Sequence, residues 1–80
     1  MSDTLERVRK VTAEVLKVDP GKVKDDSTFV GDLGAESIQS IELVAAFEEE
    51  FGIDMDEDEA LSVKSVDSAA AFIDSVIANQ

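Results

Sequence analysis

Apolar positions recur at helical spacing in three stretches of this 80-residue chain. In the first stretch, Asp3 and Glu6 have the form of a capping box. The pattern that follows predicts a helix from about Thr4 to Lys17, which Asp19-Pro20-Gly21 ends. Its apolar positions are Leu5, Val8, Val11, Val15 and Leu16.

The second stretch predicts a helix that begins near Ser37 and ends at Gly52. Its apolar stripe comprises Ile38, Ile41, Val44, Ala45, Phe47 and Phe51, and is widened by Leu43. Ser65 is expected to cap the last helix, whose 3.6-residue period runs through Val66, Ala69, Ala70, Ile73, Val76 and Ile77. The acidic run 54–59 predicts a short third helix between these two, with Met55, Ala60 and Leu61 turned inward.

A long connection precedes the second helix, and no strand pattern competes over more than a few residues. A connection of this length in so small a protein is usually functional or contains short helical turns. Its apolar residues, expected to anchor it to the core, are Val23, Phe29, Val30 and Leu33. The pattern therefore predicts an all-α fold, a small irregular four-helix bundle with three longer helices and a short third one, in a single domain over residues 1–80.

Composition excludes several classes of function. The chain contains no Cys and no His, which excludes disulfides, thiolate metal sites and a Ser–His nucleophile pair. A net charge of −12 and the absence of Trp and Tyr argue against nucleic acid as a partner. No apolar run approaches the roughly 20 residues that span a bilayer, and the N-terminus lacks a signal-peptide pattern, so a cytoplasmic location is expected.

The negative charge is concentrated in one part of the chain. Residues 25–63 contain thirteen acids and no Lys or Arg, which indicates a basic partner. Glu42, Glu48 and Glu49 lie on the side of the second helix that leads down from Ser37. This ridge is interpreted as a docking surface, and an ordinary solvated helix face is the alternative.

Alternating aspartates at Asp54, Asp56 and Asp58 resemble the start of a calcium-binding loop. An EF-hand loop beginning at Asp54 would need Gly at its sixth position and Glu at its twelfth. Those positions hold Glu59 and Ser65, so a high-affinity calcium loop is excluded and no specific metal site is predicted. An acidic first turn, favoured by the helix dipole, is the better interpretation of these residues.

Ser37 stands at the head of the second predicted helix, where a serine most often serves as a cap. Without a histidine, Ser37 is not a conventional hydrolase nucleophile. A functional role for this serine therefore requires that a group be attached to it.

The segment "FVGDLGAESIQSIELVAAFEEEFGI" resembles the acyl carrier protein family, whose motif is Asp-Ser-Leu or a close variant after Leu-Gly-Ala. The resemblance extends from about Leu5 to Ile77. It includes the spacing of the first helix, the "EEEFGI" close of the second, the acidic short helix and the "SV…AAAFI" final helix.

The resemblance implies that Ser37 carries 4′-phosphopantetheine, transferred from coenzyme A by a magnesium-dependent phosphopantetheinyl transferase. The chain would then be a monomeric carrier of acyl thioesters and not an enzyme. Its other partners would be acyl-carrier synthetases or acyltransferases, ketosynthases and reductases of fatty-acid, lipid or polyketide-type biosynthesis. The implied partner contacts are Glu36, Ile38, Glu42, Glu48, Glu49 and Glu57. An acyl pocket between the helices is expected to involve Leu43, Ala45, Ala46, Phe47, Met55, Leu61, Ala69, Ala70 and Ile73, although the alanines equally permit close helix packing.

Three departures from the family pattern suggest a carrier specialised for a dedicated pathway. Glu36 replaces the usual Asp, Gln39 replaces a frequent acid, and "IDMDEDEALS" lacks the common Pro. Two alternatives remain: a peptidyl or aminoacyl carrier with the same arm, and an unmodified acidic interaction module in which Ser37 is only a cap.

Overall fold

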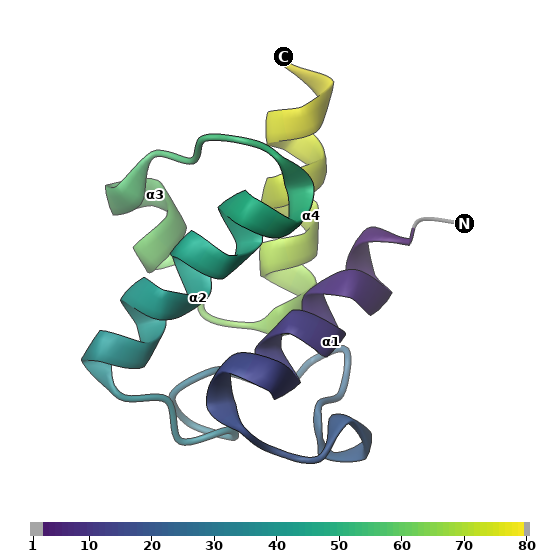
Figure 1. The fold of residues 1–80 in the computed structure, drawn as a ribbon, viewed down its shortest axis with the longest axis vertical. Coiled ribbons are helices and arrows are strands. Elements are labelled where there is room, and N and C mark those ends of the chain that lie inside the picture. The colour runs from purple at the N-terminus through teal and green to yellow at the C-terminus, as the bar shows by residue number, and fades with distance from the viewer. Residues whose placement is uncertain (1–2, 80) are drawn as a thin grey trace.

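The computed structural model describes residues 3–79 and contains four α-helices in this range. They are α1 (Thr4–Leu16), α2 (Ser37–Phe51), α3 (Glu57–Ser62) and α4 (Val66–Ala78), with a 3₁₀ turn, η1 (Pro20–Lys22), after α1. Helix α1 packs against both α2 and α4, and α3 packs against α2, while the long connection closes one end of the bundle (Figure 1). Within residues 3–79 no strand forms, and the predicted all-α, irregular four-helix architecture is confirmed.

The core consists of one face of each helix together with anchors from the connections. Its fully buried side chains are Val8 and Thr12 of α1, Val23 of the first connection, and Val66 and Ile73 of α4. The Thr12 hydroxyl donates to the Val8 carbonyl at 2.7 Å, which lets a polar side chain lie in the core without an unpaired hydrogen-bonding group.

Helix α1 ends one residue earlier than the pattern predicts, because Lys17 adopts the left-handed conformation with φ 56°. The predicted capping box at Asp3 is wrong. The backbone of Asp3 is already helical (φ −75°, ψ −9°), and its side chain makes no capping hydrogen bond. The next residue, Thr4, connects the start of α1 to α4, because its hydroxyl donates to the Asp74 carboxylate at 2.5 Å.

The caps of the later helices follow the sequence closely. Gly52 ends α2 in the left-handed conformation (φ 63°), and Asp56 begins α3 by accepting from the Glu59 N–H at 3.1 Å. Helix α3 therefore starts after Asp56, so most of the acidic run is its cap and first turn. Ser65 caps α4, and its hydroxyl donates to the Asp67 carboxylate, a hydrogen bond that lowers the pKa of Asp67.

Five residues assigned to the core or to its anchors are exposed. Ile38, Ile41 and Ile77 are 66%, 52% and 41% exposed, Val30 is 63% exposed, and Ala45 also faces solvent. The apolar residues of α2 cover too much of the helix to be buried together, and the core takes only the side that carries Leu43 and Phe47. Among residues 3–79, no helix combines the length and apolar character needed to cross a membrane.

Candidate functional site

Ser37 is the first residue of α2 and not its cap, which argues against the alternative in which this serine is only a cap. Glu36 is the N-cap, and its backbone N–H donates to the Gln39 side-chain oxygen at 2.9 Å. The Ser37 side chain is exposed and has no hydrogen bond in the described part of the chain. The hydroxyl is thus free for chemistry, because neighbouring residues organise the start of the helix.

The connection that delivers the chain to Ser37 is folded back on itself. The Ala35 N–H donates to the Phe29 carbonyl at 2.8 Å, and the Gly34 N–H donates to the Val30 carbonyl at 3.1 Å. Ala35 and Phe29 are buried, so this turn is anchored while the next residues emerge at the surface. Ser37 is therefore held at a defined place on the rim of the bundle.

The two glycines of this turn differ in what they permit. At Gly34, with φ +70°, a side chain would have free space but an unfavourable backbone conformation. At Gly31 a Cβ would come within 2.8 Å of the Thr28 hydroxyl oxygen. Gly31 therefore allows close packing inside the turn.

The exposed side of α2 forms what we call the docking face: Ser37, Ile38, Ile41, Glu42, Ala45 and Glu49. All six are exposed, and they lie within an arc of less than 180° around the axis of α2. Its apolar residues are Ile38, Ile41 and Ala45, and Glu42 and Glu49 lie together along one edge. Ile41 was assigned to the buried stripe, since a helical apolar pattern does not by itself distinguish a core face from an exposed face.

Glu48, predicted to belong to the docking surface, also makes a contact within the fold. It is half-buried, and its carboxylate accepts from the Met55 N–H at 2.9 Å. It thereby ties the end of α2 to the segment before α3. The other predicted partner contacts, Glu36, Ile38, Glu42, Glu49 and Glu57, are all exposed.

This difference gives a testable pair of variants. Glu48→Gln should lower the free energy of unfolding by about 1 kcal/mol, because a charge-assisted hydrogen bond weakens. Glu49→Gln, one position along the same helix, should leave stability within about 0.5 kcal/mol. Urea unfolding followed by circular dichroism measures both, and equal stability of the two variants would contradict the assignment of Glu48.

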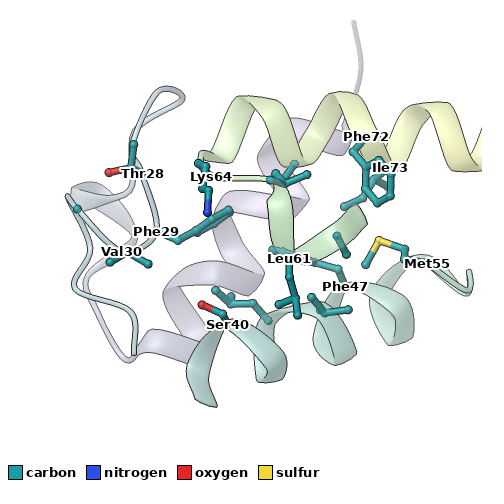
Figure 2. A pocket seen from close by; sticks show the side chains of 16 residues that line it. Thr28, Phe29, Val30, Ser40, Phe47, Met55, Leu61, Lys64, Phe72 and Ile73 are labelled. Carbon is teal, nitrogen blue, oxygen red and sulfur yellow. The ribbon is translucent and has the colours of Figure 1, made fainter. Parts of the chain in front are cut away.

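An apolar cavity of about 210 Å³ lies between α2, α3 and α4. Figure 2 shows its two ends, with Met55, Phe72 and Ile73 at one and Thr28, Phe29, Ser40 and Lys64 at the other. We call these the deep end and the loop end. Six of the nine predicted pocket residues line it: Leu43, Phe47, Met55, Leu61, Ala69 and Ile73.

Ala45, Ala46 and Ala70 do not line this cavity. Ala45 lies on the docking face, and Ala46 and Ala70 lie about 100° around their helices from the cavity-lining residues Phe47 and Ala69. Of the four alanines expected at the acyl pocket, Ala69 is the one that lines this cavity, and Ala46 and Ala70 fit the alternative that small side chains permit close helix packing. Ser40, Thr28 and Lys64 were not predicted, because polar residues give no signal in an apolar periodicity.

A shallow surface hollow surrounds Ser37 and is lined by Val30, Ala35, Glu36, Ser37, Ile38 and Ser40. Val30 and Ser40 also line the loop end of the cavity. The surface at Ser37 and the interior of the bundle therefore adjoin one another.

The acids form no preorganised metal centre. Within residues 3–79 no group of three or more carboxylates is placed to hold a metal ion. Two ion pairs occur in this range, between Arg7 and Glu50 at 2.8 Å and between Arg9 and Asp25 at 3.7 Å. Most of the negative charge is thus solvated and mutually repulsive.

Ions should accordingly stabilise the fold by screening. We expect the melting temperature to rise with millimolar MgCl₂ or CaCl₂, and NaCl at equal ionic strength to reproduce most of the rise. Differential scanning calorimetry measures this directly. A flat response, or a magnesium effect far beyond that of matched NaCl, would contradict the screening account.

The residues around Ser37 fit a phosphate-bearing group. The free hydroxyl stands at the N-terminus of the 15-residue helix α2, where N–H groups of the first turn and the helix dipole favour an anion. A family model described as "Phosphopantetheine attachment site" matches residues 6–73. Members of this family are typically non-catalytic carriers of a prosthetic group. Because the match spans most of the chain, this protein belongs to the phosphopantetheine-attachment family, as its resemblance to acyl carrier proteins predicts, and its cofactor is 4′-phosphopantetheine.

Proposed function

We propose that the protein is an acyl carrier in which Ser37 is the attachment site of 4′-phosphopantetheine. The free, exposed Ser37 hydroxyl beside a hollow that adjoins an apolar cavity is the observation that carries this proposal. The prosthetic group supplies the thiol that this cysteine-free chain lacks, and that thiol holds acyl groups as thioesters.

Attachment requires the Ser37 oxygen to lose its proton and form a phosphate ester, with release of 3′,5′-adenosine bisphosphate from coenzyme A. The chain has no histidine or cysteine, and no hydrogen bond prepares the Ser37 hydroxyl as a nucleophile. We infer that the transferase supplies the base and the magnesium ion. The contribution of this chain is to present the hydroxyl in an accessible, fixed position.

The docking face supports acidic recognition by enzymes with basic patches. Glu42 and Glu49 lie along one edge of the docking face, next to Ile38 and Ile41, so a partner would meet both hydrophobic area and negative charge beside Ser37. Transferases, synthetases, acyltransferases and ketosynthases that act on the arm would all need to approach this side. The departures at Glu36 and Gln39 favour a dedicated pathway.

The apolar lining of the cavity favours an acyl cargo over an aminoacyl or peptidyl one. Its deep end offers Met55, Phe72 and Ile73 and no charged side chain, so burial of an ammonium or a peptide group there would be costly. A hydrocarbon chain suits these surroundings.

Cargo class is tested on the cofactor-bearing protein. It is incubated with ATP and either fatty acids and an acyl-carrier synthetase, or amino acids and a panel of adenylating enzymes, and its intact mass is measured. Acylation by fatty acids with no aminoacylation is the expected result. Aminoacylation without acylation would overturn the acyl assignment and favour the peptidyl carrier.

A further inference from the structure

Gln39, two residues after Ser37, folds back onto the start of α2. Its side-chain oxygen accepts from the Glu36 N–H at 2.9 Å, and the two residues form a capping box. Gln39 is half-buried, whereas Ser37 between them in the sequence is exposed. The fold therefore holds the Gln39 amide at the same end of the helix as the Ser37 hydroxyl.

The cap uses only one half of this amide. A glutamine side chain carries an acceptor oxygen and an NH₂ group with two donors on the same carbon atom. The NH₂ group of Gln39 makes no hydrogen bond within residues 3–79. Glu serves in a capping box as well as Gln does, so the cap by itself does not require an NH₂ group here.

Two backbone donors at the start of α2 also lack a partner. The Ser40 N–H donates to the Glu36 carbonyl at 2.9 Å, and the Gln39 N–H is engaged in the capping box. The N–H groups of Ser37 and Ile38 make no hydrogen bond in the part of the chain that the structure describes. Together with the free NH₂ group, these donors suit an anion.

The chemistry of the arm matches this set of donors. A phosphodiester on the Ser37 oxygen has a negative charge shared by its non-bridging oxygens, which accept hydrogen bonds. The N-cap residue, Glu36, already places one carboxylate beside it. A second carboxylate at position 39 would repel the phosphodiester, whereas a neutral amide donates to it.

We propose that Gln39 is a positioning residue for the prosthetic group: its NH₂ group donates to the phosphodiester on Ser37 while its oxygen retains the Glu36 N–H. The contact fixes the direction in which the arm leaves the docking face. The inference rests on the proposed attachment of the arm at Ser37, and it adds to that function a residue that orients the arm.

The test compares the wild type, Gln39→Glu and Gln39→Met, each with and without the arm. A phosphopantetheinyl transferase transfers 4′-phosphopantetheine from coenzyme A, and intact mass verifies complete loading. Gln39→Glu keeps the capping oxygen and replaces the donor with a charge. Gln39→Met removes both the oxygen and the donor at similar length.

The first readout is the change in melting temperature that loading causes within each protein, because this difference cancels the loss of the cap in Gln39→Met. We expect loading to raise the melting temperature of the wild type about 2–4 °C more than that of Gln39→Met. Gln39→Glu should respond less favourably still, and high salt should remove most of this additional loss because it screens the repulsion.

The second readout is NMR of the side-chain NH₂ groups. The Gln39 signals are those that disappear in Gln39→Met, and the NH₂ group of Asn79, which donates to the Ser75 carbonyl at 2.9 Å, is an internal control. Loading should slow the exchange of the Gln39 NH₂ protons with water about threefold, as a hydrogen bond of ordinary net strength would, and leave Asn79 unchanged.

Equal effects of loading on the wild type and Gln39→Met, or unchanged exchange at Gln39, would overturn the role of this residue. A folded protein that accepts no arm would instead refute the proposed function itself, and this inference with it.

Discussion

Replacing Ser37 by alanine is expected to abolish loading completely while leaving the fold unchanged. The hydroxyl is the proposed point of attachment, so Ser37→Ala should gain no mass with coenzyme A, magnesium and a phosphopantetheinyl transferase. Its free energy of unfolding should stay within about 0.5 kcal/mol of the wild type, because the Ser37 side chain makes no hydrogen bond in the described structure.

Ser40→Ala is the matched control for this variant. Ser40 lies one turn further along α2 and borders the same hollow, and its hydroxyl donates only a long 3.4 Å hydrogen bond to Glu36. It should load fully. If Ser37→Ala lost about 1 kcal/mol of stability, as loss of a cap would cost, and still accepted the arm, the account of the site would be wrong.

Ile73→Ala should produce the largest loss of stability among single substitutions in α4. Ile73 is 1% exposed and lies both in the core and at the deep end of the cavity. Truncating it should cost about 3 kcal/mol, a large part of the roughly 5–15 kcal/mol that stabilises a small domain. Urea denaturation gives the value.

Ile77→Ala, one turn further along the same helix, makes the same chemical change at a residue that is 41% exposed. It should cost less than about 1 kcal/mol, since less apolar surface returns to water. If the two variants lost similar amounts of unfolding free energy, α4 would have to be rotated about its axis relative to the structure described. The pair thus tests the helix orientation as well as the core.

The sequence predicted the number, order and approximate limits of the helices because caps and apolar periods are local. Gly52, Asp56 and Ser65 lie where turn and cap chemistry place them. Asp3 makes no capping hydrogen bond because its own backbone is helical. The capping-box motif gives residue types and spacing, and it does not show this backbone conformation. Similarly, the backbone of Ser37 is helical, so the preceding residue, Glu36, occupies the N-cap position.

The surface was less predictable than the core. Ile38 and Ile41 continue a hydrophobic pattern, and only the packed fold shows that they face outward beside Ser37. Glu48 is chemically the same as Glu49, yet a contact with Met55, seven residues away, gives it a structural role. Such distinctions depend on which side of a helix meets its neighbours, and the spacing of residue types does not contain that information.

The most direct test of the attachment site is fragmentation of the loaded protein in a mass spectrometer. The loaded chain is digested, and the peptide that contains both Ser37 and Ser40 is fragmented. Backbone cleavage next to Ile38 or Gln39 places the two serines in different fragment ions, and the mass of each ion shows which serine carries the added group. The account predicts one 4′-phosphopantetheine, on Ser37. An arm on Ser40 or on another residue, or a folded protein that accepts no arm, would contradict it.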